Sequence, residues 1–280
     1  MLKYECFTQI IDRLAPYAYE VNLYNWGEPL LNKDIFKMVE YAHSKNVMPS
    51  MSTNLNTVRE TDVENLAQSN LEYLTVSLDG TTQETYAHYR RQGDLQLVLD
   101  NLRKLLELRR QLKRKTPFIE WQFIVMKHNL HQTDEAKRIA RELGVDLLRF
   151  IPVGLPFEAT DKATLQQEWF PRFSGASADE DSFKYPFLHK PSKTACFYLY
   201  RSITINPDGR VSPCCIVYGE KNDFGDALTQ STTELWNNEY YQSARALFST
   251  SGKPTVSTIC NRCSMFQHRA TLQIPFRPDS

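Results

Sequence analysis

The first 154 residues alternate between short apolar runs and longer segments with helical periodicity. Apolar runs typical of buried strands occupy residues 20–24, 47–51, 71–78, 118–126 and 147–153. Apolar positions spaced three and four apart predict helices over residues 2–14, 33–45, 61–67, 95–112 and 133–143. Strands that alternate with helices predict an α/β fold with a parallel sheet and right-handed crossovers.

The predicted carboxyl ends of the strands carry polar residues or glycine. These exits are residues 26–29, 52–54, 77–80, 127–129 and 152–154. Ligands of parallel sheets bind at that edge, so the pattern predicts a small-molecule site there. His128, His131 and Asp161 lie near the exits or just beyond them, but each is more typical of a surface or capping residue than of a catalytic one.

The periodicity disappears over residues 155–194, which we interpret as a linker. A second, small α+β region is expected over residues 195–268, followed by a tail over 269–280. This second region is predicted to hold a hairpin over 202–214 that turns at Pro207-Asp208-Gly209, and one helix over 232–248 capped by Thr232 or Thr233.

The six cysteines are concentrated in that second region. Cys6 stands alone, whereas five fall within 68 residues: Cys196, Cys214, Cys215, Cys260 and Cys263. A Cys-x-x-Cys pair with a distant Cys-Cys pair predicts a thiolate-ligated metal. The alternative is a set of reduced cysteines that pack as small apolar side chains. Four thiolates suit zinc and iron–sulfur alike, and the sequence leaves that choice open.

Composition removes several classes of protein from consideration. The 280 residues carry 33 basic and 33 acidic side chains, so we expect no strongly basic surface for nucleic acid. No run of 18 apolar residues occurs, so no membrane-spanning helix is expected. The first 16 residues are amphipathic and charged, unlike a signal peptide, so we expect a cytoplasmic location.

Three short motifs, in order on successive strands, resemble the radical S-adenosylmethionine (SAM) superfamily. They are Asn25-Trp26-Gly27-Glu28-Pro29-Leu30-Leu31, Ser52-Thr53-Asn54 and Val76-Ser77-Leu78-Asp79-Gly80. Downstream, Cys196, twelve residues, Gly209, four residues and Cys214 resemble the SPASM or twitch extension of that superfamily. The resemblance implies an incomplete (β/α)6 partial barrel over residues 1–154, with its first strand absent, followed by a small cysteine-ligated cluster domain. It also implies chemistry in which a [4Fe–4S] cluster cleaves SAM reductively and the resulting radical abstracts hydrogen from a substrate.

The resemblance further implies which residues bind SAM. The matched positions are Gly27, Glu28 and Pro29 for the methionyl amine, Ser52 and Asn54 for the sugar or methionine, Ser77 and Arg90 for the ribose and carboxylate, and Val153 for the adenine. Two of these residues have alternative interpretations. Glu28 is also suited to cap a helix that starts near residues 32–34, and Arg90 is also typical of a surface residue.

By the same resemblance, Cys196, Cys214, Cys260 and Cys263 are expected to ligate one auxiliary [4Fe–4S] cluster. Cys215 is the alternative to Cys214; the family spacing favours Cys214, and neighbours in a strand point to opposite faces. No cysteine follows Cys263, so a second auxiliary cluster is not expected. The partners implied are a small-molecule or peptide substrate and an electron donor such as flavodoxin or ferredoxin.

One motif of the superfamily is missing from the 280 residues. They contain no Cys-x3-Cys-x2-Cys, the motif that holds the SAM-cleaving cluster. We expect an N-terminally truncated enzyme, in which a radical-generating [4Fe–4S] cluster requires residues upstream. Truncation is favoured because the SAM-contacting residues are intact, and because loss of the first strand leaves an unpaired apolar edge. The alternative is a non-catalytic zinc-binding or scaffold protein derived from the same fold.

Overall fold

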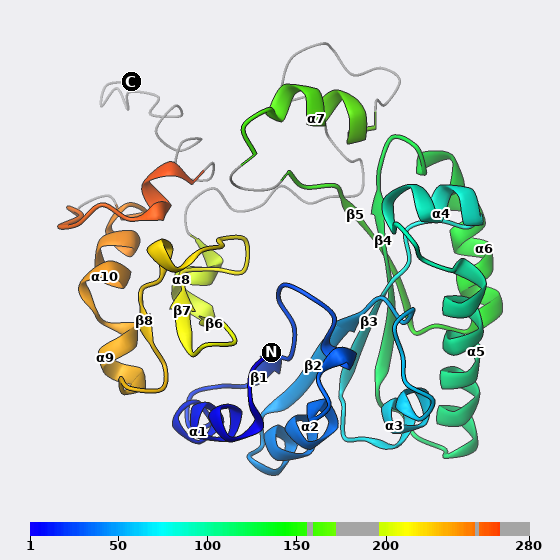
Figure 1. Cartoon of the computed structure of the whole chain (residues 1–280), viewed down its shortest axis with the longest axis horizontal. Helices are drawn as coiled ribbons and strands as arrows, with labels where there is room; N and C mark the ends of the chain where they lie inside the picture. The colour runs from blue at the N-terminus through cyan, green and yellow to red at the C-terminus, as the bar shows by residue number, and fades with distance from the viewer. Residues whose placement is uncertain (156–158, 172–195, 250–251, 264–280) are drawn as a thin grey trace, which may run out of the picture. The chain divides into compact units, whose positions relative to one another are not determined.

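The computed structural model describes residues 1–155, 159–171, 196–249 and 252–263, and these residues form two compact units (Figure 1). The first, here called the sheet unit, contains the described residues from 15 to 171. The second, the cysteine unit, contains residues 1–14 and the described residues from 196 onward. The expected tail over 269–280, and residues 172–194 of the expected linker, lie outside the described residues.

The sheet unit is built on one parallel sheet of five strands, ordered β1-β2-β3-β4-β5. Helices connect successive strands, as the alternation in the sequence predicted (Figure 1). The strands are β1 Glu20–Asn22, β2 Met48–Thr53, β3 Tyr73–Ser77, β4 Phe118–Val125 and β5 Leu147–Pro152. The helices and 3-10 turns are η1 Pro29–Leu31, α2 Ile35–Ser44, α3 Asp62–Gln68, α4 Gln83–Tyr89, α5 Leu95–Gln111, η2 Leu130–Gln132, α6 Thr133–Leu143 and α7 Lys162–Trp169.

One face of this sheet holds the apolar core. On β4, Ile119, Trp121 and Phe123 are fully buried and cluster with apolar side chains of α2, α3, α5 and α6. Successive strand residues point to opposite faces, so Glu120 and Gln122 lie on the other face. The sheet therefore has an apolar side covered by helices and an opposite side that carries polar residues of β4.

Local sequence signals explain the ends of several helices. α6 spans the predicted residues, and Gly144 closes it in the left-handed conformation at φ +77°. α5 begins after Asp94, whose side chain accepts a hydrogen bond from the backbone of Leu97 at 3.0 Å. These helices are strongly periodic, which is why their bounds were predictable.

The interval interpreted as a linker contains a helix, α7. Asp161 is its N-cap, and the Asp161 carboxylate accepts a hydrogen bond from the backbone of Thr164 at 3.1 Å. No residue of α7 is buried, so the helix carries no apolar stripe that a periodicity analysis detects. The capping role expected for Asp161 is confirmed.

The cysteine unit combines a small antiparallel sheet with short helices (Figure 1). Its strands run in the order β6-β7-β8. Cys214 lies beyond the end of β7 in a bend, so the strand-geometry argument for choosing between Cys214 and Cys215 does not apply. The elements are α1 Tyr4–Leu14, α8 Phe197–Arg201, β6 Thr204–Ile205, β7 Arg210–Ser212, η4 Glu220–Asn222, β8 Gly225–Asp226, α9 Thr232–Trp236, α10 Glu239–Ala246 and η5 Ile259–Arg262.

The single helix expected over 232–248 is instead two helices, α9 and α10. Asn238 starts α10, and its side chain accepts a hydrogen bond from the backbone of Tyr241 at 3.0 Å. The cap of α9 is Ser231, which forms a capping box with Glu234, rather than Thr232 or Thr233. The Asn237-Asn238 pair breaks the helix because asparagine favours cap positions over helix interiors.

The first helix, α1, packs within the cysteine unit, whereas the sequence placed residues 1–154 together in the barrel. Ile10 belongs to the apolar cluster of the cysteine unit. Arg13 donates a hydrogen bond to the carbonyl of Ala227 at 2.7 Å, and Thr232 donates one to the carbonyl of Arg13 at 3.1 Å. An amphipathic pattern predicts a buried face but not the element that buries it. None of the helices in the described ranges is long and apolar enough to cross a membrane.

Candidate functional site

The carboxylate of Glu28 connects the loop after β1 to the residues that follow β2. Glu28 accepts hydrogen bonds from the backbone of Leu30 at 3.1 Å and of Asn54 at 2.8 Å, one on each oxygen. Gly27 has φ +121°, and nothing lies within 4 Å of the position that a Cβ would take. Gly27 thus adopts a backbone conformation that other residues rarely adopt, and the space next to its Cα is open. Pro29 follows as the first residue of η1. An N–H at that position has no acceptor within the helix, so the lack of an N–H in proline costs no hydrogen bond.

Glu28 is an N-cap, but of η1 rather than of a helix beginning near residues 32–34. The next helix, α2, starts at Ile35 with Asp34 at its N-cap. Burial raises the pKa of Glu28 above its ordinary value of 4.5, against the opposing effect of its backbone hydrogen bonds and the Arg90 charge. A carboxylate has about four acceptor positions, so Glu28 keeps capacity for a further donor such as an ammonium group.

The two predicted serines lie side by side at the same edge. The hydroxyl oxygens of Ser52 on β2 and Ser77 on β3 are 3.3 Å apart. The side-chain oxygen of Asn54 accepts hydrogen bonds from the backbone of Asn56 at 2.7 Å and of Thr57 at 3.1 Å. This oxygen shapes the loop after β2, as asparagine side chains commonly do in turns. Val153, just beyond β5, is 9% exposed.

Arg90 is neither a free ligand nor a simple surface residue. Its Nε and Nη2 lie 2.7 and 2.6 Å from Oδ2 of Asp79, whose side chain is fully buried. The other oxygen of Asp79 accepts the backbone N–H of Ile124 at 2.6 Å. Burial raises the pKa of Asp79, and the Arg90 charge opposes that rise. The sequence analysis gave Asp79 no role beyond its place in the Val76–Gly80 motif, although it anchors the arginine predicted to bind SAM.

The polar face of the sheet carries a network that the sequence analysis did not identify. Glu120, 2% exposed, accepts hydrogen bonds from the Tyr73 hydroxyl at 2.6 Å and from Arg149 at 2.7 and 2.9 Å. Arg149 also donates to the side chain of Gln122 at 3.0 Å. The available signal was Glu120 and Gln122 alternating with apolar residues inside β4, a pattern that places both on one face.

The histidines near the β4 exit lie among aromatic rings. The rings of His128 and His88 are 4.5 Å apart, and Trp169 lies 5.8 Å from His128 and 5.6 Å from His88. Burial, followed by the charge of His88, lowers the pKa of His128. His131 lies in the short η2 turn. These contacts suit a packing role for His128.

The four cysteines predicted as ligands gather in the cysteine unit. Burial raises the pKa of the Cys214 thiol to about 11 and of the Cys260 thiol to about 12. In both cases Cys196 and Cys263 raise it further, so all four thiols lie within electrostatic range of one another. Cys196 belongs to the apolar cluster of this unit, and Cys214 and Cys260 pack against it.

The four thiols are chemically suited to ligate an iron–sulfur cluster. Over the described residues, no three His, Cys, Asp or Glu side chains are arranged to hold one metal ion. Tetrahedral zinc requires all its sulfurs to converge at about 2.3 Å from one point. A group of thiols in an apolar shell is the environment typical of iron–sulfur ligation. Cys215 is hydrogen-bonded to Tyr198 and raises the pKa of that phenol.

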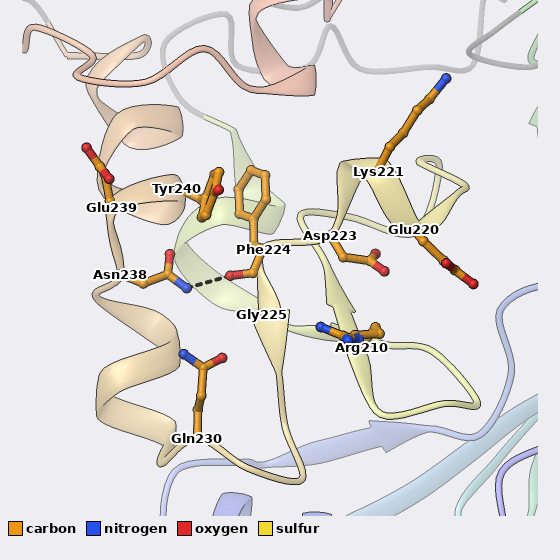
Figure 2. Close-up of a pocket in the computed structure, with 10 residues that line it drawn as sticks. All are labelled: Arg210, Glu220, Lys221, Asp223, Phe224, Gly225, Gln230, Asn238, Glu239 and Tyr240. Atoms are coloured by element: carbon orange, nitrogen blue, oxygen red, sulfur yellow. Dashed lines mark hydrogen bonds between the residues drawn. The ribbon is translucent and has the colours of Figure 1, made fainter.

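A cavity of about 680 Å³ lies elsewhere in the cysteine unit (Figure 2). No cysteine lines it. Figure 2 shows the rings of Phe224 and Tyr240 side by side, and their centroids are 5.8 Å apart. Asn238 donates a hydrogen bond to the carbonyl of Phe224 at 2.6 Å. The other lining residues are polar apart from Gly225: Arg210, Glu220, Lys221, Asp223, Gln230 and Glu239.

Comparison with known families matches both units. Residues 5–118 match the model of the radical SAM superfamily, and residues 196–264 match SPASM, an iron–sulfur cluster-binding domain. A radical SAM domain and a SPASM domain are therefore both found in the chain.

Curated relatives cover part or most of the chain. A probable GTP 3′,8-cyclase of Methanocaldococcus jannaschii is 26% identical over 45% of this chain and 41% of its own length. An AdoMet-dependent heme synthase of Methanosarcina barkeri is 25% identical over 57% of this chain and 46% of its own. The chain thus spans less than half the length of these two relatives. A Pyrococcus furiosus cofactor-modifying protein for a tungsten-containing aldehyde ferredoxin oxidoreductase is 21% identical over 94% of this chain and 79% of its own.

Solved structures confirm the fold. The enzyme anSMEcpe with bound AdoMet matches with a TM-score of 0.62 and 16% identity, over 95% of this chain and 79% of its own. Streptococcus suis SuiB bound to S-adenosylmethionine matches with a TM-score of 0.64 and 15% identity, over 94% and 64%. The expected α/β fold, a partial barrel followed by a small cysteine-rich domain, is therefore confirmed.

Proposed function

We propose that this chain is a radical SAM/SPASM-type oxidoreductase or modifying enzyme that binds SAM at the strand exits of the sheet unit. One observation carries the SAM site: Glu28, a half-buried carboxylate, bridges the exits of β1 and β2 beside the paired hydroxyls of Ser52 and Ser77. In this proposal Glu28 accepts the methionyl ammonium. Gly27, Pro29 and Asn54 hold the loops around it. Ser52 and Ser77 bind the polar part of the nucleoside or methionine.

Arg90 and Val153 take the remaining roles in this proposal. Arg90 is already oriented by Asp79, and a guanidinium can serve two carboxylates at once. The SAM carboxylate is the second one. Val153 offers an apolar contact for the adenine ring. The substrate is a peptide or a small molecule: SuiB has been solved with its precursor peptide SuiA, and the Methanosarcina barkeri relative is a heme synthase.

The same proposal assigns one auxiliary [4Fe–4S] cluster to Cys196, Cys214, Cys260 and Cys263. When bound, it supplies a one-electron acceptor or donor next to the substrate chemistry. The protein itself contributes four thiols in an apolar environment, where metal binding favours the thiolates that burial otherwise disfavours. The match of residues 196–264 to an iron–sulfur cluster-binding domain favours the cluster over the zinc alternative. The electron donor is a flavodoxin- or ferredoxin-type protein, and the location is cytoplasmic.

The test separates SAM binding from SAM cleavage. The full chain, reconstituted anaerobically with iron and sulfide, is expected to bind SAM in calorimetry. With SAM and dithionite, it is expected to form no 5′-deoxyadenosine above a protein-free blank, because the 280 residues contain no Cys-x3-Cys-x2-Cys. Absence of SAM binding contradicts the proposed SAM site. Formation of 5′-deoxyadenosine contradicts the assignment of a single, auxiliary cluster to this chain.

A further inference from the structure

Among the described residues of the cysteine unit, two side-chain polar atoms are buried without a hydrogen-bond partner. They are the hydroxyl oxygen of Tyr241 and Nη2 of Arg245. Tyr241 is fully buried, with Phe224 edge-on at 5.1 Å and Trp236 at 5.3 Å between ring centroids. Buried hydroxyl groups are normally satisfied, and an unsatisfied one destabilises the folded chain. Such an atom is suited to donate a hydrogen bond to a group bound beside it.

Arg245 brings a positive charge to the same place. Its guanidinium lies over the rings of Trp236 at 4.4 Å and Tyr241 at 5.1 Å. Its hydrogen bonds in the described residues go to the backbone carbonyls of Leu199 at 2.8 Å and Trp236 at 2.7 Å, not to a carboxylate. Burial lowers the pKa of Arg245. A cation held this way favours a negatively charged neighbour.

The proposed thiolate ligands of the cluster are candidates for this negatively charged neighbour. Tyr241 belongs to the same apolar cluster as Cys196, against which Cys214 and Cys260 pack. Burial raises the pKa of Tyr241, and the charges of Cys260 and Cys214 add to the rise. Tyr241 and three of the proposed cluster ligands therefore share one buried apolar cluster.

We infer that Tyr241 is a redox-tuning and positioning residue of the auxiliary cluster, whose hydroxyl donates a hydrogen bond to a sulfur of the cluster or its thiolates. Arg245, stacked on the Tyr241 ring, adds positive charge to this contact. This inference rests on the proposed function, since it requires the cluster at the four cysteines. Hydrogen bonds to sulfur and nearby positive charge stabilise the reduced cluster more than the oxidised one, because reduction adds a negative charge. The step concerned is one-electron reduction of the cluster core from 2+ to 1+ by dithionite, with no bond formed or broken.

The test compares Tyr241→Phe with Tyr240→Phe in the reconstituted full chain. Phenylalanine keeps the buried ring and removes only the hydroxyl, and Tyr240 is a neighbouring tyrosine that is 47% exposed. A potentiometric titration followed by electron paramagnetic resonance is expected to show a more negative potential for Tyr241→Phe. A tenfold decrease in the equilibrium constant for one-electron reduction of the cluster corresponds to a potential about 59 mV more negative. Tyr240→Phe is expected to match the wild type.

A second measurement separates tuning from a structural role. In ordinary buffer, the reduced wild-type cluster is expected to show a proton coupling by electron–nuclear double resonance that disappears after exchange into deuterated buffer, and Tyr241→Phe is expected to lack this coupling. The iron-free Tyr241→Phe protein is expected to melt at the same or a higher temperature, since an unsatisfied hydroxyl has been removed. Equal potentials and unchanged couplings in the loaded proteins overturn the inference. Failure of the wild type to take up iron and sulfide contradicts the proposed cluster itself.

Discussion

Replacing Cys214 by alanine is expected to abolish assembly of the auxiliary cluster, whereas Cys215→Ala is expected to retain it. The two residues are adjacent, so the pair forms a matched comparison of ligand and neighbour. Cys215, Cys196 and Cys263 all raise the pKa of Cys214, and of the adjacent pair Cys215 is the one hydrogen-bonded to the Tyr198 hydroxyl. Loss of one thiolate from a four-thiolate set removes one covalent attachment of the cluster, and this account expects that Cys215 does not replace it because its thiol is held by Tyr198.

The measurement is the visible absorbance and iron content after anaerobic reconstitution. Cys214→Ala is expected to retain less than about a tenth of the wild-type cluster, in line with the reliance of such clusters on thiolate ligands. Cys215→Ala is expected to match the wild type in both readouts. The reverse outcome, with Cys215→Ala colourless and Cys214→Ala brown, assigns the ligand to Cys215 and contradicts this account.

Glu28→Gln is expected to weaken SAM binding at least tenfold and to destabilise the chain. Glutamine has no charge for the methionyl ammonium. Its NH2 group also faces a backbone N–H, of either Leu30 or Asn54, since Glu28 accepts from both. One buried donor left unsatisfied costs about 1–3 kcal/mol. Calorimetry with SAM and urea unfolding measure the two effects separately, and Glu60→Gln, an exposed residue in the loop after β2, is the control.

The pH dependence of SAM binding tests the same residue. The folded pKa of Glu28 lies above the ordinary 4.5, so the carboxylate takes up its proton at a higher pH than an exposed glutamate. Wild-type affinity for SAM is expected to fall as pH decreases through that raised pKa, and Glu28→Gln is expected to lack this decrease. The stability of the folded chain is expected to depend on pH in the opposite direction to SAM affinity. The folded state binds the Glu28 proton more tightly than the unfolded state does. The resulting stabilisation is therefore full below pH 4.5 and is lost as pH rises through the folded pKa. Equal affinity of Glu28→Gln and wild type contradicts the assigned role.

The periodic parts of the fold were predictable from sequence, and the parts fixed by tertiary packing were not. α6 spans the predicted residues because its apolar stripe and its glycine cap agree. α7 has no buried residue, and the division of 232–248 into α9 and α10 depends on an asparagine cap, so periodicity failed for both. α1 was predicted as a helix, but its packing partners lie more than two hundred residues away.

In the candidate site, too, some residues were predictable from sequence, whereas the contacts set by tertiary packing were not. Short motifs identified Glu28, Ser52, Ser77 and Arg90, since they follow strands whose ends meet at one edge. They did not show that Arg90 is held by buried Asp79, because that pairing depends on side-chain directions across two loops. Tyr241 carried no motif at all: it occupies an ordinary apolar position of α10, and only its unpartnered hydroxyl in the folded chain sets it apart.

The central claim is that this chain is a radical SAM/SPASM protein with one iron–sulfur cluster at its four gathered cysteines. Metal and sulfide analysis of the anaerobically reconstituted wild-type chain tests it most directly. We expect about four irons and four sulfides per chain, the composition of one [4Fe–4S] cluster, with brown colour and no stoichiometric zinc. A colourless chain that binds one zinc ion per molecule contradicts the claim.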